Sequence, residues 1–226
     1  MSYRRFNNDI TIESMDVASI LNGNWEFRVE HKGIKIFSSR VSDSDIYGFK
    51  GELELQVSLK KLVSLFYDMA NFNRWVHHLV EMEVLEKNDE TEYVMRQVID
   101  TPWPLQQREV IMRSWMVSAG ENAIALTMKE EPDYLPLNPK YHRVQHATGI
   151  WVFTPNGHGV VHVTFVMHLD PGKDVPAPVS NAGLFEVPFY SLNNLRTLLK
   201  DTSYNPPWPK ELEQHLSIVE DEPDTP

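Results

Sequence analysis

The sequence predicts a single α+β domain, in which a curved antiparallel sheet of about nine strands packs around one long C-terminal helix. Most of the chain before residue 170 consists of short runs in which apolar and polar residues alternate, as in strands with one solvated face. The stretch 176–200 instead repeats its large apolar residues every three or four positions, which is the spacing of an amphipathic helix. Such a helix must bury its apolar face on the sheet.

The apolar face of the long helix is made by five large side chains: Phe185, Phe189, Leu192, Leu195 and Leu199. Pro188 lies within this helix. Because a proline inside a helix lacks a backbone donor and crowds the preceding turn, we expect a bend or break between residues 187 and 189. Any space that remains between the helix and the sheet is where a ligand could lie.

Composition limits the classes of function. The chain has 226 residues, a formal charge of −11, 42% hydrophobic residues and no cysteine. This length suits one large domain, and the lack of cysteine excludes disulfides and thiolate metal sites. The negative charge opposes binding to nucleic acid and permanent residence on an anionic membrane, although it allows transient membrane contact. No apolar run follows the N-terminal arginines, so we expect a soluble, cytoplasmic protein.

Three parts of the chain differ in composition. Residues 1–24 form a polar arm with a short helix that ends at Asn22-Gly23-Asn24. Residues 25–200 form the folded domain. Residues 201–226 form a proline-rich, acidic tail, which we expect to pack partly and then fray.

The first strands and one helix follow in order. A hairpin is expected from Trp25 to Val41, and the stretch from Phe49 to Val57 shows the cleanest alternation in the chain. Ser58 is expected to cap a helix that runs toward Trp75.

Six further runs have strand character: 80–86, 92–100, 109–117, 123–129, 144–153 and 160–169. Short connections favour an antiparallel meander with one early helical crossover. Since long antiparallel strands twist and curl, the sheet should offer a concave face to the helix.

Two longer connections, 101–107 and 130–141, carry large apolar side chains that include Trp103 and Leu135. These side chains could line the mouth of a cavity or contact a partner. Alternatively, they fold back onto the sheet.

The nine histidines do not indicate a metal site. His158, His162 and His168 share the solvated face of one strand, and the adjacent His77 and His78 cannot face the same way on a helix. No HExxH motif, phosphate-binding glycine loop or GxSxG motif is present. We therefore expect no metal, no cofactor and no enzymatic activity.

Two arginines inside strands are candidate contacts for the polar end of a ligand. Arg96 lies between Val94 and Val98, and Arg113 shares its strand face with Trp115. A buried guanidinium needs an acidic partner, water or a ligand head group. The alternative is that each arginine lies at a rim position, where its aliphatic part packs against the protein and its guanidinium reaches water.

Methionines are spread over the predicted strands: Met95, Met112, Met116, Met128 and Met167. They can fill the core, but thioethers also line adaptable apolar pockets.

Six segments occur in the order found in one family: Trp25 with GIKIF (33–37), FKGE (49–52), Trp75, TPWPLQQRE (101–109), DPGKDVP (170–176) and PFYSLNNLR (188–196). In this order the segments resemble the START domain, the lipid-transfer module related to steroidogenic acute regulatory protein. The resemblance implies a helix-grip fold around a tunnel for one lipid or sterol-like molecule. Two departures are Lys173, where many members have a second glycine, and Arg96, where some members bury an acid.

The resemblance and the residue patterns together predict binding, and potentially transfer, of a hydrophobic small molecule. The predicted ligand contacts are Met95, Arg96, Trp103, Arg113, Trp115, Leu135, Phe185, Phe189 and Leu192. One alternative is an enzyme of the polyketide cyclase or aromatase type, which would need a titratable pair that points inward, with His146, Arg96 and Arg113 the residues concerned. The other is a partner-binding module whose tunnel is filled by Phe185, Phe189 and Trp115.

Overall fold

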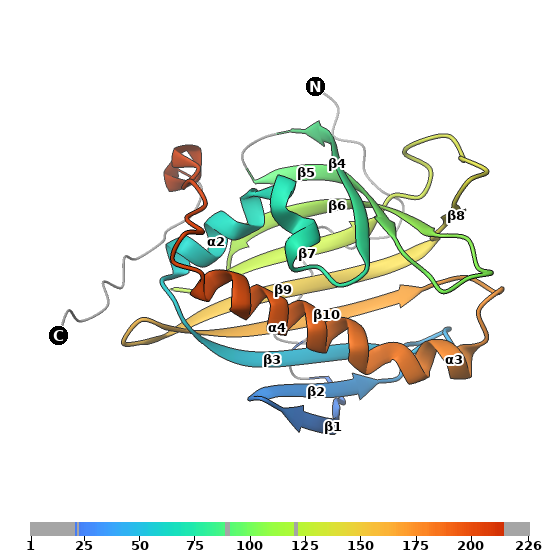
Figure 1. Ribbon diagram of the computed structural model, residues 1–226, viewed down its shortest axis with the longest axis horizontal. Coiled ribbons are helices and arrows are strands. Elements are labelled where there is room, and N and C mark those ends of the chain that lie inside the picture. The colour runs from blue at the N-terminus through green and yellow to red at the C-terminus, as the bar shows by residue number, and fades with distance from the viewer. Residues whose placement is uncertain (1–20, 22, 89–90, 120–121, 215–226) are drawn as a thin grey trace.

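In the part of the chain that the structure describes, a single ten-stranded sheet, antiparallel except at one two-residue strand, forms the main layer of the fold (Figure 1). The computed structural model describes residues 21, 23–88, 91–119 and 122–214. The strands are β1 (Glu26–His31), β2 (Ile34–Ser39), β3 (Gly48–Gln56), β4 (Leu79–Lys87), β5 (Glu92–Ile99), β6 (Arg108–Ser118), β7 (Ile124–Glu130), β8 (His142–Arg143), β9 (His146–Gly157) and β10 (Val160–Asp170). Their order is β1-β2-β3-β10-β9-β7-β6-β5-β4, and the two-residue β8 pairs in parallel with β6. The predicted antiparallel sheet of about nine strands is confirmed.

Strand alternation decides which side chains reach the concave face. In β10, Val161, Val163 and Phe165 are buried in the main core, as the sequence predicted. His162 has the opposite parity and lies within 3.4 Å of Glu54, an exposed side chain of β3. A second, smaller cluster on the other face consists of Ala125, Ile150, Val152 and Val166, with Leu21 and Trp25 packed against it.

The crossover from β3 to β4 carries the chain from one half of the sheet to the far edge. It consists of α2 (Leu59–Tyr67) and the 3₁₀ helix η2 (Met69–Arg74). The Ser58 hydroxyl accepts a hydrogen bond of 3.2 Å from the Lys61 backbone N–H, so the predicted N-cap is confirmed. Trp75 follows directly and is buried.

The C-terminal helical segment lies across the concave face of the sheet (Figure 1). It comprises α3 (Ala177–Ala182), a 3₁₀ turn η3 (Gly183–Phe185) and α4 (Glu186–Lys200). The predicted break between residues 187 and 189 is wrong, because the irregular turn lies earlier, at residues 183–185. Pro188 is tolerated inside α4 since it lies in the first turn, where a backbone N–H has no partner within the helix.

Gly51 in β3 allows α4 to lie close to the sheet. A Cβ atom at this position would lie 2.6 Å from Leu192 Cδ1 and 3.4 Å from Pro188 Cβ. Leu192 is fully buried as a result. The helix is thus held on β3, at one side of the concave face.

The chain continues to pack after α4. The Tyr204 hydroxyl donates a 2.8 Å hydrogen bond to Asp68, and Leu212, in the 3₁₀ helix η4 (Lys210–Gln214), is fully buried in the main core. The segment 201–214 therefore belongs to the packed structure. All but the last residues of the short helix expected within residues 1–24, and the end of the tail, lie outside the described residues.

Candidate ligand-binding site

A cavity of about 500 Å³ lies between the concave face and the C-terminal helical segment. Its walls come from β5, β6, β7, β9 and β10 on the sheet side, and from α3, η3 and the start of α4 on the other. All five methionines singled out in the sequence line it: Met95, Met112, Met116, Met128 and Met167. Flexible thioethers provide a surface that can adapt to an apolar molecule.

Aromatic rings form another part of the lining. Trp151 stacks on Phe165 with ring centroids 3.8 Å apart, and Phe66 packs against both Trp75 and Trp151. Phe66 comes from α2 and Trp75 directly follows η2, while Trp151 and Phe165 come from β9 and β10. Their contacts therefore hold the crossover against the sheet. They give the cavity a rigid apolar wall.

Buried polar atoms in the lining that have no hydrogen-bond partner within the described part of the chain include Ser180 Oγ and, in the two most deeply buried residues of this group, Trp75 Nε1 and Ser114 Oγ. Trp75 is 2% and Ser114 1% exposed. An unsatisfied buried polar group destabilises a fold by about 1–3 kcal/mol. These two atoms are therefore the natural partners of a polar atom on a ligand, or of an ordered water.

The described lining contains no lysine and no arginine. Its two carboxylates belong to Asp100 and Glu186, and both residues are exposed. An anionic group deep in the cavity, away from His77 and His78 at the rim, would therefore have no lysine or arginine to pair with, and burying it unpaired would be unfavourable.

The loop 101–107 forms part of the rim. Trp103 lines the cavity and is 92% exposed. Arg108 anchors this loop to the segment before α3, because its guanidinium donates to the Gln106 and Pro171 carbonyl oxygens and, at 2.8 Å, to both carboxylate oxygens of Asp174. The anchor holds two sides of the rim together.

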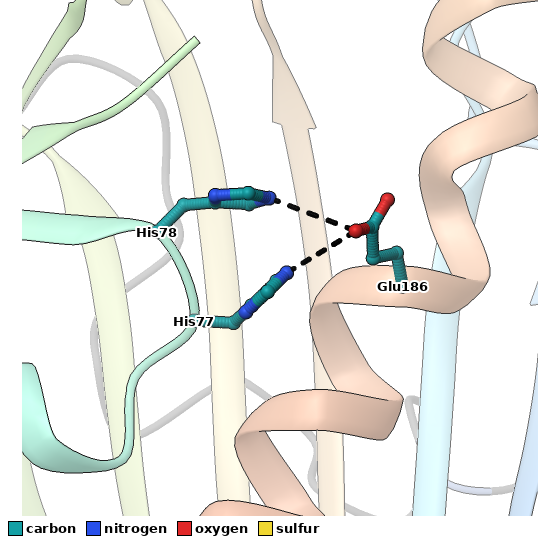
Figure 2. Close-up of side chains that lie close together, drawn as sticks. All are labelled: His77, His78 and Glu186. Carbon is teal, nitrogen blue, oxygen red and sulfur yellow. Dashed lines mark hydrogen bonds and ion pairs between the residues drawn. The ribbon is translucent and has the colours of Figure 1, made fainter. Parts of the chain in front are cut away.

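At another point of the rim, His77, His78 and Glu186 gather (Figure 2). His77 Nε2 lies 3.4 Å and His78 Nε2 3.9 Å from Glu186 Oε1. Burial lowers the pKa of His77, the neighbouring His78 lowers it further, and Glu186 opposes both effects. The sequence argument assumed a helix here, but the histidines lie in a turn, and a positive φ of 62° at His78 places the two rings side by side.

Of the predicted ligand contacts, Met95 and Trp103 line the cavity. Phe185 and Phe189 are partly buried against the core outside it, and the Phe189 ring contacts His31. Leu192, on the face of α4 that meets the sheet, packs against Gly51. Trp115 and Leu135 also lie outside the lining. The alternative of a filled tunnel finds no support, because none of the three side chains expected to fill it reaches this space.

Arg96 and Arg113 require a correction, because their guanidinium groups lie on the opposite face of the sheet. Arg96 donates to Glu109 at 2.5 Å and to Glu81 at 2.9 Å, while Arg113 donates to Glu131 and Glu92. Their apolar strand neighbours Val94, Val98 and Ile111 are buried, but none of them lines the cavity. His146 is also outside, with a side chain that is 72% exposed. None of the three residues that the enzymatic alternative needs therefore points inward.

Sequence reasoning missed the buried, unpaired polar atoms of Trp75 and Ser114 in the lining. A signal for Ser114 was present in the sequence. This residue lies two positions from both Met112 and Met116, so all three side chains share one face of the strand.

Comparison with known proteins agrees with this geometry. The model of the START domain family matches residues 9–217. The chain belongs to the START domain family. The predicted helix-grip architecture of a START domain is thereby confirmed.

Individual relatives extend the comparison. A crystallised fragment of the STAR-related lipid transfer protein from Xanthomonas axonopodis is 30% identical, with a TM-score of 0.73 over 79% of this chain and 100% of that fragment. Human STARD10 shares the fold at 15% identity, with a TM-score of 0.71 over 92% of each chain. The uncharacterised protein PA1579 of Pseudomonas aeruginosa is 25% identical over 173 residues, which are 76% of this chain and 85% of that protein. Within the described part of this START domain, no helix combines the length and apolar character needed to cross a bilayer.

Proposed function

We propose that this START domain binds, and passes on, an uncharged hydrophobic molecule that carries one or two hydrogen-bonding oxygens, such as a sterol or another neutral lipid. The cavity is the observation that carries this proposal. Its volume of about 500 Å³ falls within the usual range of ligand sites, and its lining is largely apolar. The lipid-transfer description of the Xanthomonas relative supports the same reading.

Burial of the ligand would supply most of the affinity. Removing roughly 400 Å² of apolar ligand surface from water at about 25 cal/mol per Å² contributes about 10 kcal/mol. Association offsets at least about 4 kcal/mol of this through lost translational and rotational freedom. The remainder, at most about 6 kcal/mol, corresponds to a dissociation constant of roughly 40 μM or weaker, which suits a protein that must release what it carries.

Charge in the lining argues for a neutral ligand. The described lining offers the Trp75 N–H and the Ser114 hydroxyl, and it contains no lysine or arginine. These groups can hydrogen bond a hydroxyl or carbonyl oxygen. They cannot neutralise a phosphate or a carboxylate.

A vesicle extraction experiment tests the proposal. The protein is incubated with vesicles that contain a neutral panel (a sterol, a diacylglycerol and a fatty alcohol) and an anionic panel (a fatty acid and a phosphatidic acid), and is then separated and extracted for mass spectrometry. Retention of at least one neutral lipid above every anionic lipid is expected. Preferential retention of the anionic lipids would refute the neutral-ligand proposal.

Removing either buried polar partner should weaken binding without emptying the cavity. Ser114→Ala and Trp75→Phe each delete one unsatisfied polar atom. A lost hydrogen bond to a neutral group is worth about 0.5–1.5 kcal/mol, so we expect an affinity decrease of roughly 2- to 10-fold for each variant. Titration with the best lipid from the panel measures this. An unchanged affinity in both variants would show that the ligand's polar end lies elsewhere.

Transient membrane contact is proposed for the rim around Trp103. This side chain and Val179 are exposed, apolar and at the edge of the cavity. The loop 101–107, which carries Trp103, also contacts the loop 130–141, since Gln106 donates a 2.9 Å hydrogen bond to the Pro139 carbonyl oxygen. An apolar rim lets a ligand move between bilayer and cavity without crossing water.

Trp103→Ala is therefore expected to slow lipid transfer between vesicles several-fold while leaving the equilibrium affinity within about twofold. Substitutions of exposed surface residues usually change the free energy of unfolding by less than about 0.5 kcal/mol, so the variant should remain folded. A matched control is Phe27→Ala, which removes an exposed aromatic side chain on β1, outside the cavity lining and outside both apolar loops. Equal transfer rates for Trp103→Ala and the wild type would contradict a role for Trp103 in membrane contact.

A further inference from the structure

We propose that His77, His78 and Glu186 form a site for a divalent transition metal, Zn²⁺ in particular, at the rim of the cavity (Figure 2). One ligand atom from each residue lies within 4.8 Å of the other two. Two imidazole nitrogens and one carboxylate oxygen are a ligand set that suits Zn²⁺, and such a three-residue set leaves a fourth position for water or another group.

Binding of Zn²⁺ would require little rearrangement of the three side chains. Ligands at 2.0–2.2 Å from a tetrahedral Zn²⁺ lie about 3.4 Å from one another. His77 Nε2 and Glu186 Oε1 are already 3.4 Å apart, and His78 Nε2 lies 3.9 Å from the same oxygen. Since Glu186 and His78 are partly exposed, rotation of their side chains can close the remaining gap.

The backbone around the histidines is held in place before any metal arrives. The His77 N–H donates a 3.0 Å hydrogen bond to Ser191 Oγ of α4, and the His78 carbonyl accepts one of 2.8 Å from Asp100. The His77 ring also stacks on Tyr190, with centroids 4.8 Å apart. A site whose ligands are already positioned binds its metal more tightly, because less ordering is needed.

Other histidines in the described residues approach carboxylates without forming a comparable group. His146 lies 3.9 Å from Glu130, and His162 lies 3.4 Å from Glu54. Each is one imidazole with one carboxylate. Over the ranges that the structure describes, three ligand atoms come together only at residues 77, 78 and 186.

A metal here would join two parts of the rim. His77 and His78 lie in the turn before β4, Glu186 opens α4, and all three residues line the cavity. Coordination would restrain movement of α4 away from this turn and so slow exchange of a bound molecule. This last consequence rests on the proposed function, whereas the metal site itself does not.

Calorimetric titration of the full-length, tag-free chain with Zn²⁺ alone tests the site. One equivalent should bind to the wild type. His78→Ala and Glu186→Gln should each weaken the affinity by at least about tenfold, since even groups that only support a metal ligand can have effects of that size. His146→Ala, a change at an exposed histidine, should leave the affinity unchanged.

Hydrogen exchange provides the second measurement. Zn²⁺ should slow amide exchange at the start of α4 and in the turn at residues 77–79 in the wild type, but not in Glu186→Gln. Failure to bind Zn²⁺, or equal binding by the wild type, His78→Ala and Glu186→Gln, would overturn the metal site. No lipid is present in these titrations, so either result leaves the test of lipid binding unaffected.

Discussion

Replacing Ser114 with tryptophan is expected to abolish ligand binding while leaving the domain folded. Ser114 lies on β6 between Met112 and Met116, and its side chain faces the cavity. An indole at this position would occupy space that the ligand needs, so the ligand could enter only at an overpacking penalty of about 1–3 kcal/mol or more. The upper part of this range corresponds to an affinity loss of about 100-fold or greater.

The measurement compares lipid titrations and thermal unfolding of the same preparations. Ser118→Trp is the matched control, because it places the same side chain on the same strand at an exposed position outside the lining. The control should bind the lipid as the wild type does. Wild-type affinity in a folded Ser114→Trp variant would mean that the ligand binds outside this cavity.

Glu109→Ala is expected to cause the largest loss of stability, about 3–5 kcal/mol. The Glu109 carboxylate is buried on the convex side of the sheet, where it accepts hydrogen bonds from Arg96 Nε and from both Nε and Nη2 of Arg143. The Arg143 side chain is itself almost fully buried. Removing the carboxylate would leave guanidinium charge inside the protein without its partner.

Chemical denaturation measures this loss of unfolding free energy. Glu83→Ala serves as a control, since Glu83 is exposed and reaches the same Arg96 only at 3.8 Å. Its effect should stay below about 1 kcal/mol, as for other surface ion pairs. If Glu109→Ala does not fold, the milder Glu109→Gln variant, which keeps the side-chain shape, allows the comparison. Equal effects of the Glu109 and Glu83 changes would contradict the structural role assigned to the buried cluster.

The same cluster predicts a dependence on pH. Burial alone would raise the pKa of Glu109, but hydrogen bonds from Arg96 and Arg143 outweigh burial, and the pKa lies below its ordinary value of 4.5. The contribution of this carboxylate to stability is therefore fully present above that pH and is lost as the pH falls through the folded-state pKa. The stability difference between wild type and Glu109→Ala should accordingly shrink under acidic conditions.

Local patterns in the sequence predicted the fold well. Alternation placed Val161, Val163 and Phe165 of β10 in the core, and a serine before an apolar helical repeat predicted the Ser58 cap. Both patterns depend on neighbours in the chain. They therefore do not require knowledge of what packs against them.

The site was harder to predict because it depends on which face of each strand is concave. Arg96 and Arg113 do share a face with apolar residues, but that face is the convex one, where nearby carboxylates pair with them. From the sequence, His77 and His78 were rejected as a metal-binding pair because a helix was assumed there, whereas their geometry depends on a positive φ at His78 and on the approach of Glu186 from α4. Neither feature leaves a mark in the local sequence.

Native mass spectrometry of the protein purified from its natural source tests the central claim most directly. The account predicts that the folded wild type carries about one uncharged hydrophobic molecule per chain, which is released on unfolding and is absent from Ser114→Trp. A wild-type protein that shows only its bare mass, and that takes up no member of the neutral lipid panel, would contradict the claim that this cavity exists to hold a ligand.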